Sequence, residues 1–211
     1  MLKKKDKEKG GTKKAEAPKV TRKTHAERKD EITDAALRLI ASRGLAALTV
    51  TSLSAEVGLT GGALYRHFPS TDAIIEAAAE RTVVLLEASF PDPKLSPPEW
   101  LDSFVELRTK AVSGHQGVAS LMLTEQLAQA LPETATKRLQ GVVRNTFSQI
   151  RDTLRRGQAE GSIRKDFSAD DLTILVMGVV QMTVLSQTGA LFGKTVKTNR
   201  AYATLRSLLA A

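Results

Sequence analysis

The sequence predicts an all-α protein, and three observations carry this prediction. Apolar residues recur at helical spacing, as Ile32, Ala36, Leu39 and Ile40 do along a first helix over about residues 26–43. Glycine and proline residues separate such segments, beginning with Gly44 as the C-terminal cap of this helix. No strand-like alternation of apolar and polar residues holds along the chain. The apolar fraction of 42% is sufficient for a packed core.

Two short helices follow the first one and together predict a helix-turn-helix unit. Thr49 caps a helix that ends at Gly58, and Thr60 caps a third helix after a turn of about three residues. Each helix has one apolar side, formed by Val50, Leu53 and Val57 in the second helix and by Leu64 and Phe68 in the third.

Residues 92–211 predict a second helical domain. Pro97 or Pro98 suits the first turn of a helix, and Ser168 with Asp171 three residues later forms a capping signal. The helix after Ser168 is apolar nearly all round, but polar residues leave no run of about 20 apolar residues. Burial in a protein assembly is therefore favoured over a membrane span. The expected helices cover residues 97 to about 113, 118–130, 132–161, 172–191 and 199–209.

The formal net charge of +8 is concentrated at the N-terminus. Residues 1–29 hold 12 Lys or Arg against 4 Asp or Glu, whereas the remaining residues hold 19 of each. A lysine-rich segment without aromatic residues cannot bury apolar surface, which predicts a disordered arm over residues 1–23. The arm is either a solubilising tail or a binding segment for a polyanion. DNA is favoured over a membrane because no bulky apolar residues interleave the charges.

The composition argues against enzymatic and metal chemistry. The chain contains no cysteine, which excludes disulfides, thiolate metal sites and cysteine nucleophiles. Its three His residues lack metal-ligand spacing, and no catalytic triad or glycine-rich phosphate loop is recognisable. The first residues lack the apolar core of a secretory signal. We therefore expect a cytoplasmic protein that is not an enzyme and needs no cofactor or metal.

Residues 26–80 resemble the DNA-binding domain of TetR-family transcriptional regulators. The matching residues run in register without a gap: Ile32, Ala35, Ala36, Leu39, Gly44, Thr49, Val50, Leu53, Ala55, Gly58, Thr60, Gly62, Leu64, Tyr65 and Phe68. The resemblance implies a helix-turn-helix DNA-binding domain over residues 24–70 and a connecting helix over residues 71–91. It also implies a helical effector-binding and dimerisation domain over residues 92–211.

The resemblance implies a DNA contact surface around the third helix. Gly62 lets the start of this helix approach the duplex closely, whereas Gly61 stands where family members commonly carry a DNA-reaching side chain. Arg66 is the best candidate for reading a base edge, since its forked donors can address guanine N7 and O6 together. The other expected DNA-binding residues are Thr49, Thr51, Thr60, Ala63, Tyr65 and His67, together with Arg22, Lys23 and Arg28 at the arm.

Each of these assignments has a simpler alternative. Thr60 can act only as a helix cap, Tyr65 and His67 can merely pack, and Arg66 can be solvated or bound to a phosphate. Thr51, Ala63 and Arg66 form a thin code for base reading. We therefore expect the basic arm to supply contacts that the third helix lacks, by entering the minor groove.

The C-terminal domain is expected to mediate dimerisation and ligand sensing. The resemblance implies a two-fold homodimer, formed through the last two long helices, on a palindromic operator in double-stranded DNA. It also implies a small-molecule effector. The candidate ligand-binding residues are Trp100, Phe104, Gln126, Phe147, Met177 and Gln181. Alternatively, these aromatic and methionine side chains form core, and Gln181 bridges helices.

Two functions remain open at this stage. The first is a TetR-like DNA-binding transcriptional regulator, acting as a repressor that a small-molecule ligand releases. The second is a low-specificity DNA-binding protein that organises chromosomal DNA or acts through a protein partner. The thin code for base reading and the basic arm favour the second.

Overall fold

The computed structural model describes residues 23–113, 131–188 and 198–211. The elements in these ranges are helical, which confirms the all-α prediction: α1 (His25–Arg43), η1 (Leu45–Ala47), α2 (Val50–Val57), α3 (Gly61–Tyr65), α4 (Thr71–Glu87), α5 (Pro97–Ser113), α8 (Glu133–Glu160), α9 (Ala169–Thr188) and α10 (Thr198–Leu209). The arm residues 1–22 with Arg22, and the expected helix over residues 118–130 with Gln126, lie outside the described residues.

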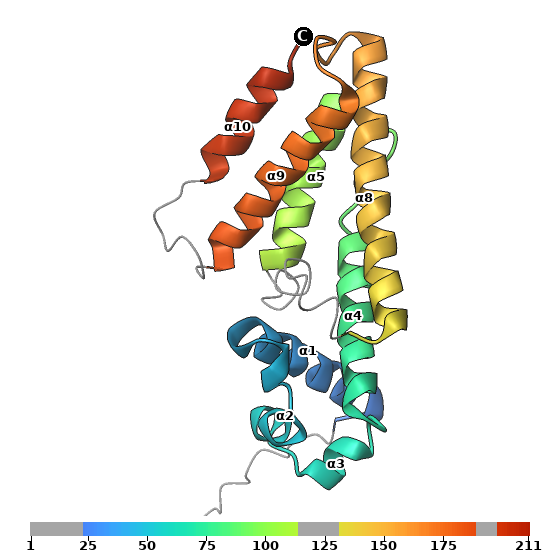
Figure 1. Cartoon of the computed structure of the whole chain (residues 1–211), viewed down its shortest axis with the longest axis vertical. Coiled ribbons are helices and arrows are strands. Elements are labelled where there is room, and N and C mark those ends of the chain that lie inside the picture. Colours follow the sequence, from blue (N-terminus) through green and yellow to red (C-terminus); the bar gives the residue numbers. More distant parts are fainter. Residues whose placement is uncertain (1–22, 114–130, 189–197) are drawn as a thin grey trace, which may run out of the picture.

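The helix α4 joins two parts of the molecule. Helices α1, α2 and α3 form one end, and α5, α8, α9 and α10 form the elongated body (Figure 1). α4 starts beside α3 and packs along the first half of α8, where the Arg138 side chain donates two hydrogen bonds to the Glu80 carboxylate at 3.0 and 2.5 Å. The Thr134 hydroxyl donates to Glu76 at 2.7 Å. α4 is therefore held by both parts.

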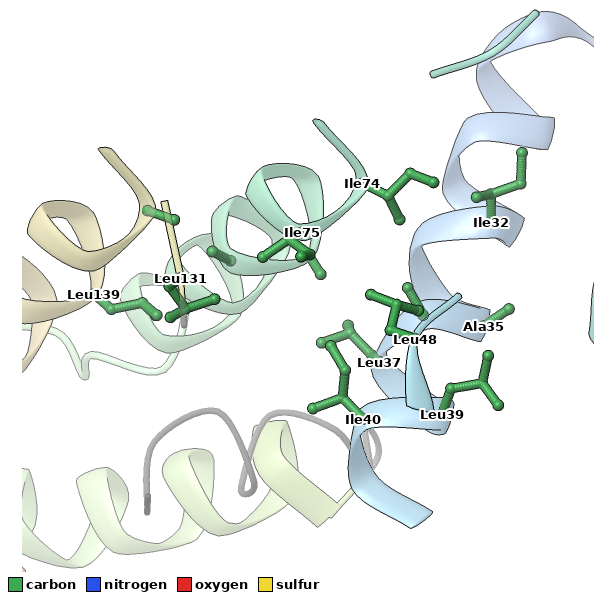
Figure 2. Packing of buried hydrophobic residues seen from close by; sticks show 14 of the residues in the cluster. Ile32, Ala35, Leu37, Leu39, Ile40, Leu48, Ile74, Ile75, Leu131 and Leu139 are labelled. Carbon is green, nitrogen blue, oxygen red and sulfur yellow. The ribbon is translucent and has the colours of Figure 1, made fainter. Parts of the chain in front are cut away.

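Two clusters of buried side chains form the core. The first cluster draws on α1, α2, α3, α4 and the first half of α8, together with Val112 of α5 and Val184 of α9, and the second on α5, the second half of α8, α9 and α10. Figure 2 shows Ile74 and Ile75 of α4 between side chains of α1 and Leu139 of α8. The first cluster thus connects the N-terminal helices with the adjoining part of the body.

Local capping explains where the N-terminal helices begin and end. The Thr49 hydroxyl accepts a hydrogen bond from the backbone N–H of Ser52 at 3.1 Å, and the Thr60 hydroxyl accepts one from Ala63 at 3.2 Å. Gly58 ends α2 with a φ of 66°, a left-handed conformation that favours glycine. Both predicted caps and the predicted stop are confirmed.

The third helix is shorter than the sequence suggested. α3 covers Gly61–Tyr65, Arg66 and His67 form the turn after it, and Phe68 lies beyond the helix. Pro69 explains the early end, because a residue before proline disfavours the helical conformation. The prediction that the helix includes Phe68 was wrong, although Phe68 is buried in the first cluster.

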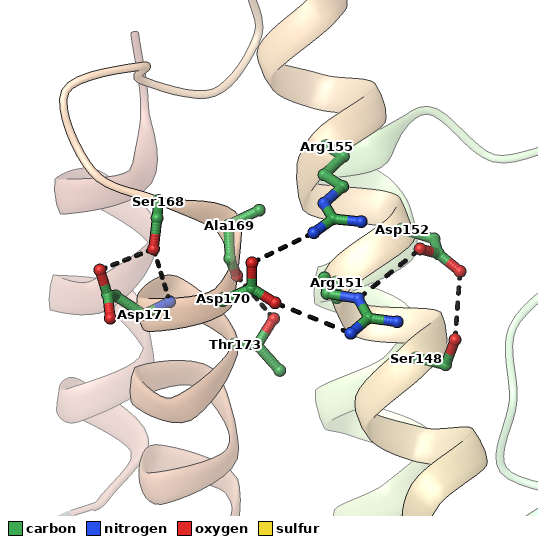
Figure 3. A network of polar contacts seen from close by, with 9 residues as sticks. All are labelled: Ser148, Arg151, Asp152, Arg155, Ser168, Ala169, Asp170, Asp171 and Thr173. Carbon is green, nitrogen blue, oxygen red and sulfur yellow. Dashed lines mark hydrogen bonds and ion pairs between the residues drawn. The ribbon is translucent and has the colours of Figure 1, made fainter.

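The first turn of α9 is fixed to α8 by charged side chains (Figure 3). The Asp170 carboxylate lies 3.1 Å from the Arg155 guanidinium and 3.7 Å from that of Arg151. The Ser168 hydroxyl accepts a hydrogen bond from the backbone N–H of Asp171 at 3.0 Å, which confirms the predicted capping signal. These contacts set the register between the two long helices.

One side of α9 is apolar and uncovered within the single chain. Ile174 is 65% exposed and Leu175 55% exposed, although Val176 and Val180 are buried in the second cluster. In the part of the chain that the structure describes, α9 is the one helix long and apolar enough to cross a membrane, over Ala169–Ser186. Of that window, 39% is buried inside the protein. The same helix thus contributes to the core and leaves an apolar face open.

Candidate nucleic-acid interface

The start of α1 and the end of α3 lie against each other. The imidazole rings of His25 and His67 have their centroids 4.6 Å apart. A capping box fixes the first turn of α1, since the Thr24 hydroxyl accepts from the Glu27 backbone and the Glu27 carboxylate accepts from the Thr24 backbone. The described chain begins at Lys23, so the arm joins the folded protein next to the helix-turn-helix unit.

Three exposed side chains near α3 have hydrogen-bond donors available. Tyr65 is 49% exposed, and its hydroxyl has no hydrogen-bond partner among the described residues. Arg66 is exposed at the C-cap of α3, and none of the described carboxylates forms an ion pair with it. The Thr60 hydroxyl accepts from the Ala63 backbone and can still donate its own proton. Such groups suit phosphate oxygens and base edges.

His67 lies in a cationic environment. Burial lowers its pKa below the ordinary value, and the nearby His25, Arg28, Lys29 and Arg66 lower it further. The His67 Nδ1 atom is buried without a hydrogen-bond partner among the described groups. An anion at this position would relieve the repulsion and favour the protonated ring.

The two glycines of α3 differ in their surroundings. A Cβ atom built at Gly61 would lie 3.2 Å from the Cγ1 atom of Val50, whereas one at Gly62 would meet nothing within 4 Å. Packing against Val50 therefore explains why a glycine stands at position 61. Gly62 has none in the described chain, which leaves close approach of a ligand as the physical reason for a glycine there.

The remaining predicted DNA-binding residues differ in how free they are. Glu31 pairs with both Lys23 at 2.8 Å and Arg28 at 2.6 Å, so these two cations are partly neutralised. The Thr49 hydroxyl is engaged in the capping box of α2. Thr51 is exposed and Ala63 is half-buried. Their contacts with DNA stay predictions.

The predicted ligand-binding residues do not share one environment. Trp100 and Phe104 are buried in the second cluster with rings stacked 5.3 Å apart, and Met177 packs against that cluster. Phe147 is 38% exposed on α8, and Gln181 is exposed on α9. Gln126 lies outside the described residues. The first three side chains lie together, whereas the two exposed ones lie apart from them.

A surface pocket of about 500 Å³ lies at the junction of the two parts of the molecule. It is lined by residues of α1, α4 and α8, including Lys29, Glu76, Glu80, Thr134 and Arg138. None of the predicted ligand-binding residues that the structure describes lines it. Its walls include the side chains whose hydrogen bonds join α4 to α8.

Sequence reasoning missed one residue of the body, Arg108. Its side chain is buried in α5. The signal was present in the sequence, because Leu101, Phe104, Val105 and Val112 form an apolar stripe in which position 108 carries the single charge. A charged residue in such a stripe predicts a buried cation.

Two family profiles match the chain. Bacterial regulatory proteins of the tetR family match residues 32–78, and the tetracyclin repressor-like C-terminal domain matches residues 97–211. The two matches include the helix-turn-helix unit and the whole helical body.

Curated relatives are similar over much of the chain. The HTH-type transcriptional regulator YerO of Bacillus subtilis is 28% identical over 161 residues, 73% of this chain and 54% of YerO. The chain thus spans about half the length of YerO. The HTH-type transcriptional repressor KstR2 of Mycolicibacterium smegmatis is 27% identical over 69% of this chain and 72% of KstR2. The nucleoid occlusion factor SlmA of Marinobacter nauticus is 28% identical over 75% of this chain and 85% of SlmA.

Solved structures share the fold. KstR2 of Mycobacterium tuberculosis superposes with a TM-score of 0.74 and 21% identity over 87% of this chain and 95% of KstR2. AibR in complex with isovaleryl coenzyme A and operator DNA gives 0.72 and 16% identity over 87% of this chain and 98% of AibR. The C-terminal profile alone covers more than half of the chain. The chain therefore belongs to the TetR family of DNA-binding transcriptional regulators, which are not enzymes.

Proposed function

We propose that the protein is a cytoplasmic repressor that binds a palindromic operator as a homodimer and is released by a small-molecule effector held in residues 92–211. The observation that carries the DNA-binding part is the group of free donors at the end of α3, beside the cationic start of α1. Family membership and the AibR complex, which contains both operator DNA and a small molecule, support the rest.

The DNA contacts divide by chemistry. The Thr60 and Tyr65 hydroxyls and the His67 ring bind phosphates and fix the orientation of the domain. Arg66 reads a guanine, and Thr51 and Ala63 line the base edges. Lys23, Arg28 and Arg22 lead the arm toward the minor groove, where cations respond to groove width. This division makes specificity depend mainly on Arg66.

A matched pair of tyrosine variants tests the DNA surface. Tyr65→Phe removes a free hydroxyl, whereas Tyr202→Phe removes one that donates to Asp102 in the body at 2.7 Å. A hydrogen bond to a charged group contributes about 1.5–3 kcal/mol. Tyr65→Phe should thus weaken binding of a labelled duplex about tenfold or more in fluorescence anisotropy, whereas Tyr202→Phe should not. Equal affinities of wild type and Tyr65→Phe would remove Tyr65 from the interface.

The open face of α8 and α9 is proposed as the dimer interface. It contains Phe147, Ile174, Leu175, Gly178 and Met182, which lie exposed in the single chain. Two-fold pairing of this face with a second copy would bury these side chains and bring α8 and α9 together with their mates. Asp170, Arg151 and Arg155 hold the two helices in register for this pairing.

Two glycine variants test the dimer. A Cβ atom at Gly178 or at Gly141 meets nothing within 4 Å among the described residues, so a side chain can start at either position without a clash in the monomer. Gly178→Arg should give monomers by light scattering and weaken operator binding, because the charge would be buried in the interface. Gly141→Arg on α8 is the control and should stay dimeric. A dimeric Gly178→Arg protein would rule out this face.

A second function rests on a specific observation, the similarity to nucleoid occlusion factors. A low-specificity DNA-binding protein needs phosphate contacts more than base contacts. Gly61 and Gly62 carry no side chains for base reading, and the N-terminal 29 residues carry most of the net charge. Enrichment of DNA without a common motif would favour this function over an operator-specific repressor.

A further inference from the structure

The body of the protein contains a buried cation that forms no ion pair with any described residue. Arg108 of α5 is 5% exposed. Within the described ranges, none of the carboxylates lies close enough to form an ion pair with it. Burial lowers its pKa to about 10, so the guanidinium still carries its charge at neutral pH. A buried charge without a partner is strongly unfavourable unless a bound anion compensates it.

The Arg108 guanidinium has aromatic rings against its faces and makes one hydrogen bond with the described residues. The guanidinium carbon lies 5.0 Å from the Phe104 ring centroid and 5.3 Å from that of Phe90. Its one hydrogen bond among the described residues is a long one of 3.3 Å to the Thr146 hydroxyl. The Nε atom is buried and has no hydrogen-bond partner in the part of the chain that the structure describes.

The unused donors match the geometry of an acidic group. A guanidinium has five N–H donors in a planar fork, which suits two-point binding of a carboxylate or a phosphate. The Thr146 hydroxyl is neutral and donates its proton to the Val142 carbonyl. It therefore does not balance the charge of Arg108. The aromatic rings take the faces of the cation, and its edge is left for an anion.

We propose that Arg108 anchors the acidic group of the effector, and that the effector is an amphipathic organic anion whose apolar body lies against the partly buried Phe90. This inference rests on the proposed function, since it assumes that the effector binds in the body. The acidic group is a carboxylate or a phosphate monoester, which share the same two-point chemistry.

Trp100 supplies a built-in reporter for this site. It is the single tryptophan of the chain and stacks on Phe104 with an interplanar angle of 5°. The full-length protein is titrated with decanoate, decyl phosphate and uncharged decanol, and tryptophan fluorescence and Tm are recorded. We expect decanoate or decyl phosphate to change the fluorescence and raise Tm at concentrations at least tenfold below those needed for decanol. The tighter of the two anions identifies the acidic group.

Two methionine variants separate the anchor from general charge effects. Arg108→Met and Lys110→Met remove one positive charge each from α5, the first buried and the second exposed. Arg108→Met should keep or raise Tm without a ligand, because an uncompensated charge is removed, and should weaken anion binding at least tenfold. Lys110→Met should bind like wild type. A purely structural Arg108 would instead lower Tm on substitution and leave anion binding unchanged.

Arg108→Lys keeps the test decisive if the methionine variant does not fold. Lysine retains the charge but loses the planar fork, so anion binding should weaken while the fold persists. Wild-type protein that binds the anions no better than decanol, or variants that keep wild-type anion affinity, would overturn the inference. DNA binding by the same preparations is measured in parallel. Intact DNA binding without an Arg108-dependent anion response defeats this inference alone, whereas loss of DNA binding by wild type defeats the proposed function.

Discussion

The imidazole rings of His25 and His67 lie in contact, tilted by 40° with centroids 4.6 Å apart, and join the first turn of α1 to the turn after α3. The contact places two titratable rings and the side chains of Arg28, Lys29 and Arg66 in one small region. The start of α1 and the turn after α3 thereby form one cationic region, and the protonation of His67 becomes sensitive to any nearby phosphate.

DNA affinity should therefore depend on pH through His67. Burial and the neighbouring cations lower its pKa below 6.5 in the free protein. A DNA phosphate favours the charged ring and raises this pKa in the complex, so binding takes up a proton. Affinity should increase as pH falls from about 8 to 6. Anisotropy titrations across this range should show a weaker pH dependence for His67→Gln than for wild type.

The lowered pKa of His67 also makes the stability of the protein depend on pH. Because the pKa of His67 is lower in the folded protein than in the unfolded chain, the unfolded chain binds more protons. The contribution of His67 to the free energy of unfolding is therefore present above pH 6.5 and is lost as pH falls below it. The free energy of unfolding of His67→Gln should be less sensitive to acid than that of wild type. Identical pH profiles for wild type and His67→Gln, in DNA binding and in unfolding, would contradict this role.

Gly62→Ala should separate folding from DNA binding. The Cβ atom fits the protein freely, and alanine favours a helix by up to about 1 kcal/mol over glycine. If the duplex approaches this backbone, the methyl group should weaken DNA binding by about 1 kcal/mol or more per subunit through overpacking. Urea unfolding and anisotropy measure the two effects.

Gly61→Ala is the matched variant and should gain less stability, because its Cβ atom lies 3.2 Å from the Cγ1 atom of Val50. Unchanged DNA affinity of Gly62→Ala would show that the duplex stays away from this position.

Deletion of residues 2–21 tests the basic arm. Each phosphate that a protein neutralises contributes about 0.9 to the slope of log affinity against log salt. If the arm binds DNA, the deleted protein should show a flatter slope, by about 0.9 for each phosphate that the arm neutralises in the full-length protein. Affinity measurements between low and moderate salt supply both slopes. An unchanged slope would reduce the arm to a solubilising tail.

Glycine at position 157 should be required for packing within the body. A Cβ atom there would lie 2.6 Å from the Cδ1 atom of Ile163 and 3.0 Å from the Cβ atom of Pro97. Overpacking costs about 1–3 kcal/mol, which exceeds the gain of about 1 kcal/mol in helix propensity. Gly157→Ala should thus unfold at lower urea, whereas Gly141→Ala in the same helix should be neutral or more stable. The opposite order of the two variants would mean that α8 adjusts easily around Ile163.

The parts of the fold that were predictable depend on local signals. Thr49, Thr60 and Ser168 cap helices through side-chain hydrogen bonds to backbone within three residues. The row of apolar residues from Ala135 to Leu154 predicted α8 because helical spacing is also local. Gly44 likewise ends α1 where the sequence placed it.

The features that escaped prediction depend on residues far apart in the chain. The ring contact of His25 with His67 and the close approach of Gly61 to Val50 arise only once three helices pack together. Arg108 was visible as a charge in an apolar stripe, but the absence of a carboxylate beside it, among the described residues, required the positions of α5 and α8. The exposed side of α9 needed the same information.

The operator-specific repressor is tested most directly by selecting bound duplexes from a random DNA library. The selection uses wild type, the protein without residues 2–21, and Arg66→Ala. We expect wild type to enrich a two-fold symmetric motif, the deleted protein to keep this motif with lower affinity, and Arg66→Ala to lose preference at one guanine in each half-site. Salt-sensitive binding by wild type without any enriched motif would contradict the operator-specific repressor and favour the low-specificity DNA-binding function.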